Sequence, residues 1–306
     1  MTTTVRSRDP LTRTARREAV YFIALQSLLA LAATAVAAAE DVDVRRIEDA
    51  SPLGQAAAYG MALTPLVAAF AVRWRTTGRL RGWGFRRTSW RALLLAWAVG
   101  VLPVLAAALA VWTTGAGRFD GAAAAVALGL GSPLLAAVTA GTLMVLPYVL
   151  LALAEDVGWR GLLVTRLRQI SRPRTVYLVS GTAWSLSHVW LLLFLGGVPE
   201  GVSPLYAVAM FTIGTTALGA ILAAMQLRWG MWPGVVAHAA VNAVLYHFTE
   251  PATATTGTAT AWIATETGLA YAAAMVLAAL VFLRWFATAA AHQPHTSGTG
   301  DASRRK

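Results

Sequence analysis

The sequence contains no cysteine and very few charged residues. Only 13% of its 306 residues are charged, whereas about a quarter is usual for a soluble domain. The missing cysteine excludes disulfides, thiolate metal ligands and a cysteine nucleophile. Hydrophobic residues make up 57% of the chain, which leaves too little polar surface for nucleic-acid binding despite a net charge of +11. The composition therefore predicts a polytopic helical membrane protein without a nucleic-acid partner.

Long apolar stretches set the expected number of membrane spans. A helix needs about 20 mostly apolar residues to cross the hydrocarbon core. The stretches that meet this length are 19–39, 53–72, 92–112, 132–154, 175–196, 204–227, 231–248 and 262–283. A Gly- and Ala-rich segment at 113–131 is apolar enough for a partial or re-entrant helix. We therefore expect an all-α transmembrane bundle of about eight spans.

The basic residues test this layout independently. With a cytoplasmic N-terminus, 22 of the 25 basic residues fall in cytoplasmic segments, and the outer loops hold only Arg45, Arg46 and Arg118. The same outer loops collect acidic residues, such as Glu40 and Glu250. Because cytoplasmic loops of membrane proteins carry the Lys/Arg excess, the sequence predicts that both ends are cytoplasmic. The net charge then reports the topology and not a partner.

Ionisable side chains are scarce within the expected spans, and the few that occur there are candidates for function. Glu155 and Asp156 end the fourth span, and His188 lies within the fifth. His238 and Asn242 lie in the seventh. A carboxylate, two imidazoles and an amide form a set that can perform hydrolysis or bind a cation.

Residue spacing places these groups on helix faces. His238 and Asn242 are four residues apart and share one face. Asp156 and Arg160 have the same spacing with the acid first, which favours an ion pair within the helix. Glu155 is turned by about 100° from Asp156 and can face the bundle interior while that pair forms. The residues alone leave open that the two acids only end an interfacial helix and that each histidine only bonds to a neighbouring helix.

Three motifs within about residues 130–250 resemble those of the CPBP family. This family comprises intramembrane proteases that include the type II CAAX prenyl endopeptidases and bacteriocin-processing or self-immunity (Abi-like) proteins. The first motif, Glu-Glu-x-x-x-Arg in the family, is EDVGWR at 155–160. The second, an aromatic residue followed by three residues and His, is WSLSH at 184–188, and the third is HAAVN at 238–242 after WP at 232–233. Asp156 replaces the usual Glu, and Trp184 replaces the usual Phe.

The resemblance implies an intramembrane endopeptidase. Its expected catalytic residues are Glu155, His188, His238 and Asn242. Glu155 would be the general base that activates a water, with His188 helping to orient it. His238 and Asn242 would donate hydrogen bonds to the developing oxyanion. Asp156 and Arg160 would support the end of the helix that carries Glu155.

The apolar stretches and the resemblance together divide the chain. We expect a basic cytoplasmic tail at 1–18, N-terminal transmembrane helices at 19–125 and the catalytic membrane core at 126–250. A last transmembrane helix at 251–283 precedes a disordered cytoplasmic tail at 284–306.

Metal dependence stays open at this stage. Glu155, His188 and His238 are also a ligand set that suits zinc, and family members are often labelled metalloproteases. The His-Glu-x-x-His helix of many zinc proteases is absent from the sequence. The resemblance favours a mechanism that requires no cofactor, with a divalent metal such as zinc as the alternative.

Two other functions are compatible with the sequence. One is a catalytically silent immunity or scaffold protein, and the other is a proton-coupled transporter in which the buried acid and histidines relay protons. The Ala- and Arg-rich composition, with Lys306 as the only lysine, is typical of a high-GC prokaryote. We therefore expect a multi-pass protein of a bacterial plasma membrane that acts on a membrane protein or peptide, and prenylated CAAX substrates are not expected.

Overall fold

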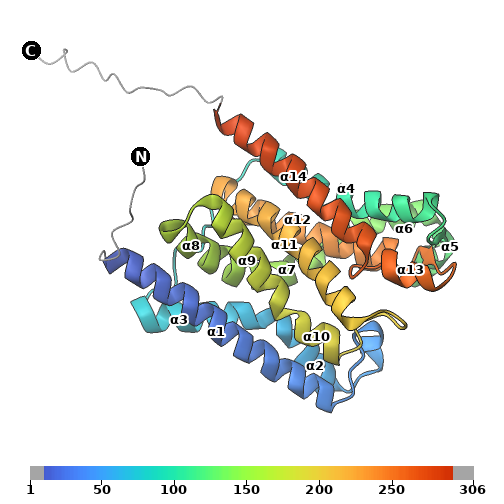
Figure 1. The fold of residues 1–306 in the computed structure, drawn as a ribbon, viewed down its shortest axis with the longest axis horizontal. Coiled ribbons are helices and arrows are strands. Elements are labelled where there is room, and N and C mark those ends of the chain that lie inside the picture. Colours follow the sequence, from blue (N-terminus) through green and yellow to red (C-terminus); the bar gives the residue numbers. More distant parts are fainter. Residues whose placement is uncertain (1–9, 292–306) are drawn as a thin grey trace, which may run out of the picture.

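The computed structural model describes residues 10–291, with side chains up to residue 287. Nearly all of its regular structure is helical, and the strands Arg118–Phe119 (β1) and Thr253–Ala254 (β2) form one short antiparallel pair. Both described ends of the chain lie at the same end of the bundle (Figure 1). The prediction of an all-α polytopic helical bundle is confirmed.

Helices follow one another along both halves of the chain. Those of the first half are α1 (Pro10–Ala39), η1 (Val44–Asp49), α2 (Pro52–Gly60), η2 (Met61–Leu63), α3 (Thr64–Thr77), α4 (Trp90–Thr113), α5 (Gly121–Ala127), α6 (Pro133–Gly141) and α7 (Val145–Asp156). Those of the second half are η3 (Val157–Val164), α8 (Thr165–Ile170), α9 (Pro173–Ser187), α10 (Val189–Phe194), α11 (Pro204–Trp229), α12 (Met231–Val244), η4 (Leu245–Thr249), α13 (Thr258–Ile263) and α14 (Leu269–Ala291). Serine caps and prolines in the first turn mark several helix starts, as at Ser51 and Pro52 of α2.

Seven helical segments of the described chain are long and apolar enough to cross a membrane. These are Pro10–Ala39, Pro52–Thr77, Trp90–Thr114, Pro133–Ile170, Pro173–Phe194, Pro204–Trp229 and Leu269–Ala287. They correspond to seven of the eight expected spans. The remaining one, the seventh expected span at 231–248, is helical as α12 and η4 but is not among these segments. Its polar residues His238, Asn242 and His247 reduce its hydropathy, and most of α12 is buried inside the bundle.

Both expected tails are helical over part of their length. Helix α1 begins at Pro10, so part of the expected tail at 1–18 is helical, because Ala15 and Glu18 pack inside the bundle. Helix α14 continues to Ala291, so the tail expected at 284–306 is helical over its first residues. The remaining parts of both expected tails, 1–9 and 292–306, lie outside the described residues. The segment at 113–131 contains the strand β1 and the seven-residue helix α5, which packs against α6 and is too short to cross a bilayer.

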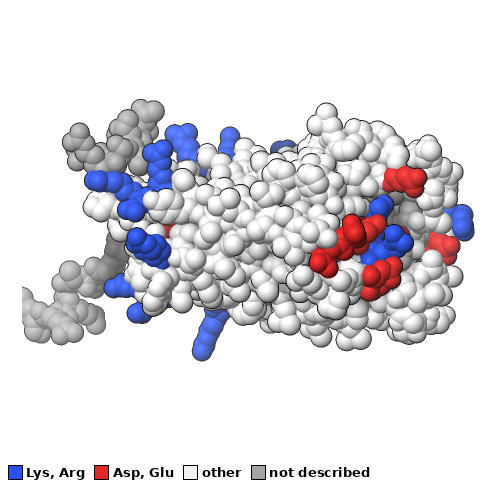
Figure 2. All heavy atoms as spheres, turned by 90° about the horizontal axis from the view of Figure 1, so that it is seen from below, with Lys and Arg blue, Asp and Glu red and all other residues white. Residues whose placement is uncertain are grey.

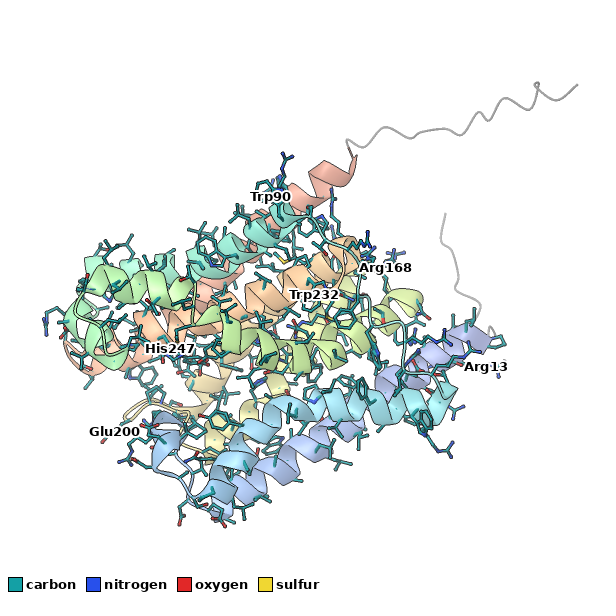
Figure 3. All side chains as sticks on the ribbon, turned by 180° about the vertical axis from the view of Figure 1, so that it is seen from behind. Arg13, Trp90, Arg168, Glu200, Trp232 and His247 are labelled. Atoms are coloured by element: carbon teal, nitrogen blue, oxygen red, sulfur yellow. The ribbon has the colours of Figure 1, made fainter. Side chains whose placement is uncertain are left out.

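The charge asymmetry expected from the sequence is present in three dimensions. Arginine side chains gather where α1 begins, and acidic side chains gather near the opposite end (Figure 2). Arg13 and Arg168 lie at the first end, whereas Glu200 lies toward the other (Figure 3). By the positive-inside rule the arginine-rich end is the expected cytoplasmic end.

Two close helix contacts position the middle of the bundle. A Cβ atom added at Gly100 of α4 would lie 2.5 Å from the carbonyl oxygen of Ala237 in α12. One added at Gly158 of η3 would lie 2.6 Å from the carbonyl oxygen of Pro65 in α3. Small residues allow helix backbones to approach closely in membranes. These glycines let α4 and α3 press against the two helices that carry the candidate site.

The helix that contains Glu155 is continuous through three segments, α7, η3 and α8. Its central part, Val157–Val164, is π-helical and entirely buried. Such local widening of a helix occurs often at functional sites. Here it follows directly after Glu155 and Asp156 and contains Arg160, so the first motif lies where the helix changes its winding.

Candidate active site

The four predicted catalytic residues line one cavity. Glu155 comes from the end of α7, His188 from the junction of α9 and α10, and His238 and Asn242 from α12. Together they border a cavity of about 160 Å³. The structure therefore brings together residues that are as far as 87 positions apart in the sequence. The shared helix face predicted for His238 and Asn242 is confirmed, since both line the same space.

Glu155 and His188 face each other across a gap that suits a water molecule. His188 Nε2 lies 3.9 Å from Glu155 Oε2, which is too long for a direct hydrogen bond. His188 Nδ1 lies 2.9 Å from the carbonyl oxygen of Trp184. A carbonyl only accepts, so Nδ1 carries the proton in this contact, and Nε2 is the ring nitrogen that faces Glu155. Both side chains remain partly exposed to the cavity, 28% for His188 and 13% for Glu155.

Trp184 binds the candidate general base directly. Its indole Nε1–H donates a hydrogen bond of 2.9 Å to Glu155 Oε2. The departure from the usual phenylalanine thus adds a donor whose partner is the candidate catalytic carboxylate. Hydrogen bonds to charged acceptors are stronger than neutral ones. We infer that Trp184 orients Glu155, a contact that sequence spacing did not reveal.

Asp156 connects the first and third motifs inside the bundle. Its Oδ1 lies 2.9 Å from Arg160 Nη1, so the predicted ion pair within the helix is confirmed. The same oxygen lies 3.5 Å from His238 Nδ1. The Arg160 guanidinium also lies over the Trp184 ring, 3.8 Å from its centre. All of these side chains are buried, so the acid and its arginine hold the two helices of the site together.

Glu155 and His188 also border a second cavity. This space of about 120 Å³ lies on the side of α1, α2 and α3 and is lined by Gln26, Met61 and Pro65 among others. The first cavity lies on the side of α11, α12 and α14. The Glu155 carboxylate and the His188 imidazole therefore lie between two separate cavities.

The outer part of the first cavity contains groups for which the sequence offered no site prediction. Tyr246 donates a hydrogen bond of 2.7 Å to Glu266, and Tyr271 borders the same space. Tyr246 and Glu266 are 20 residues apart and follow no shared motif, so spacing alone did not connect them. Glu250 lies close by, outside the spans, and burial together with the charge of Glu266 raises its pKa to about 8.

Zinc bound by Glu155, His188 and His238 is the alternative that the sequence left open. Within residues 10–291, no group of three or more His, Cys, Asp or Glu side chains is placed to hold a metal ion. Glu155, His188 and His238 border one cavity without forming such a group. The present arrangement does not fit a zinc site, and no step of the chemistry below is routed through a metal.

Comparison with known families identifies the domain. Residues 137–244 match the family model described as type II CAAX prenyl endopeptidase Rce1-like. No curated protein matches the chain. The matched range lies within the core expected at 126–250 and contains all three motifs. The chain thus carries an Rce1-like domain of the CPBP type, as its motifs indicated, and this domain supports an intramembrane endopeptidase, a hydrolase embedded in a lipid bilayer.

Proposed function

We propose that the protein cleaves peptide bonds of membrane proteins or peptides with a water activated by Glu155. The observation that carries this proposal is the gap of 3.9 Å between Glu155 Oε2 and His188 Nε2, in a cavity that His238 and Asn242 also line. A water bridging the two atoms would donate one hydrogen bond to each of them. By the composition of the chain, we place this activity in a bacterial plasma membrane.

The reaction follows from these positions. As the water oxygen attacks the carbonyl carbon of the substrate, the Glu155 carboxylate takes a water proton. The carbonyl oxygen becomes negative and accepts hydrogen bonds from Asn242 and His238, which for His238 requires a proton on the ring nitrogen that faces the cavity. Glu155 then gives its proton to the leaving amine as the C–N bond breaks. General base catalysis contributes about 10²–10⁴ in rate, and each oxyanion donor about 10²–10³.

The supporting residues hold this geometry. Trp184 donates to Glu155 through its side chain and accepts from His188 through its carbonyl oxygen. One residue therefore sets the position of the carboxylate and the orientation of the imidazole. Asp156 lies within 3.5 Å of His238 Nδ1 and so places a carboxylate beside that ring. A peptide lying across Glu155 would extend into both adjoining cavities.

The decisive experiment compares variants that remove one reacting group at a time. Purified protein in liposomes is incubated with a library of membrane-anchored peptides, and cleavage products are counted by mass spectrometry. We expect Glu155→Gln and His188→Ala to lower product formation by about 10²-fold or more. Glu200→Gln, the same chemical change in the outer loop between α10 and α11, is the matched control and keeps full activity. Full activity of a stably expressed Glu155→Gln would refute the proposal.

Two further measurements separate the alternatives. Metal content of the purified protein, and its activity after chelation, test the proposal that no cofactor is required; loss of activity on chelation with recovery on adding zinc would overturn it. If the wild-type protein forms no products but moves protons in a manner that depends on Glu155, the transporter alternative replaces the proteolytic one. A protein inactive in both assays would point to a scaffold or immunity role.

A further inference from the structure

A basic cavity lies at the arginine-rich end of the bundle, apart from the candidate active site. It has a volume of about 420 Å³ and lies between the start of α1, the end of α3 and α8. Arg73, Arg79 and Arg166 line it together with polar side chains such as Thr77 and Gln169. None of its lining residues borders the two cavities at Glu155.

The positive charge of this cavity exceeds its negative charge. Glu18, a fully buried acid on α1, is the acidic partner of two of these arginines, Arg73 and Arg166, within the described chain. Its carboxylate accepts from Arg73 Nη1 at 3.4 Å and from the Thr76 hydroxyl at 2.6 Å, and it also forms a very short contact with Arg166 Nε. Within residues 10–291, one carboxylate is thus paired against three guanidinium groups, so two positive charges of the cavity have no counter-charge among the described residues.

Several donors around the cavity are also unused. Arg166 contacts Glu18 through Nε, which leaves its two terminal nitrogens for another acceptor. Arg73 uses both terminal nitrogens, for Glu18 and for the carbonyl oxygen of Arg81, and its Nε is buried without a hydrogen-bond partner in the described structure. Arg79 is exposed at the rim, directly after the left-handed Gly78 that ends α3, and no ion pair or hydrogen bond engages it within residues 10–291.

We propose that this cavity binds a phosphate group, supplied by the headgroup of an anionic phospholipid. Guanidinium groups bind phosphate oxygens in pairs, and three of them converge here from α3, the following loop and α8. The cavity lies at the end of the bundle that the charge distribution assigns to the cytoplasmic leaflet, where anionic headgroups are found. Basic pockets between transmembrane helices at this depth are suited to such headgroups.

One arginine of the proposed phosphate site lies on the same continuous helix as Glu155. Arg166 belongs to α8, which continues the helix that carries Glu155 and Arg160. A phosphate held by Arg166 and Arg79 would tie this helix to the loop after α3. Since the ligand would bind the folded protein, it would also raise its stability by mass action. This inference does not depend on the proteolytic function.

The test uses the full-length protein in nanodiscs. Thermal unfolding is compared in phosphatidylcholine alone and with phosphatidylglycerol added, and native mass spectrometry counts the retained phosphatidylglycerol. We expect the anionic lipid to raise the Tm by about 5 °C. Arg79→Gln should lose most of this rise and weaken lipid retention about tenfold. Arg166→Gln should also reduce the rise in Tm and the lipid retention. It removes a partner of buried Glu18 as well, so the decisive variant is Arg79→Gln at the exposed position.

The matched control is Arg174→Gln, an exposed arginine at the start of α9 that does not line the cavity. It should keep the full rise in Tm. A separate arm adds inorganic phosphate to phosphatidylcholine nanodiscs: a rise lost in Arg79→Gln would support the phosphate site with free phosphate as its source. The proposal is overturned if neither anion raises the Tm, or if Arg174→Gln loses as much of the rise as Arg79→Gln.

Discussion

Removing the charge of Arg160 should destabilise the protein strongly because Asp156 would stay buried without its cation. The two side chains are 3% and 0% exposed, and Arg160 Nη1 lies 2.9 Å from Asp156 Oδ1. Breaking one side of a buried ion pair costs about 3–5 kcal/mol. The same guanidinium lies 3.8 Å from the centre of the Trp184 ring, a contact worth about 2 kcal/mol when desolvated. We expect Arg160→Met to lower the free energy of unfolding by about 3–5 kcal/mol in all, since these losses overlap.

A double variant distinguishes the effect of an unpaired buried charge from the effect of lost packing. Asp156→Asn combined with Arg160→Met removes both charges, and neutral replacements of a buried pair often cost little. In the described structure, neither oxygen of Asp156 has an aligned hydrogen-bond donor, which reduces what the neutral pair would lose. The double variant should therefore be more stable than Arg160→Met alone by about 2 kcal/mol.

The assay is unfolding by sodium dodecyl sulfate in mixed micelles, followed by circular dichroism. Arg45→Met is the matched control, because Arg45 pairs with Asp43 at a largely exposed position and should change stability by less than about 1 kcal/mol. A double variant no more stable than Arg160→Met would refute the electrostatic account. So would an Arg160→Met cost as small as that of the control.

Three further outcomes are expected. Trp184→Phe removes the indole N–H that donates to Glu155. The kcat in the peptide assay should therefore fall about tenfold with little change in KM. An unchanged kcat would show that this hydrogen bond does not position the carboxylate. Gly100→Ala places a Cβ 2.5 Å from the Ala237 carbonyl oxygen, so it should lower the free energy of unfolding by about 1–3 kcal/mol in the same assay. A variant as stable as the wild type would contradict the close contact. Burial and a nearby carboxylate raise the pKa of Glu250 to about 8, so its contribution to stability is present below its ordinary pKa of 4.5 and is lost as the pH rises toward 8. Glu250→Gln should flatten this dependence and be more stable than the wild type above about pH 8, as measured by the Tm across the range; an unchanged profile would count against the shift.

The sequence selected four residues that line one cavity, but it did not reveal the contacts between helices around them. Scarcity of charge inside apolar spans singled out Glu155, His188 and His238, and helical spacing placed His238 beside Asn242. The hydrogen bond from Trp184 to Glu155 and the approach of Asp156 to His238 join different helices. Periodicity along one helix carries no information about its neighbours, so these contacts could not be read from it.

The boundaries of the spans show a similar limit. Apolar length located every membrane helix, yet α1 begins nine residues before the expected start because Glu18 is buried by Arg73 and Arg166. A charged residue looks like the end of a span when its partners are 55 and 148 positions away. The seventh expected span is less apolar than the others because it carries the histidines and the asparagine of the site inside the bundle.

By itself, the sequence determined the helical membrane class, the separation of charge between the two ends and the identity of the candidate catalytic residues. These follow from hydrophobic length, from charge position and from short motifs, all of which are local properties of the chain. Only the tertiary structure decided which groups meet: the gap between Glu155 and His188, the buried pair that supports His238, and the basic cavity formed by Arg73, Arg79 and Arg166. Each of these depends on how separate helices pack, and packing is set by complementary surfaces that only the folded chain brings together.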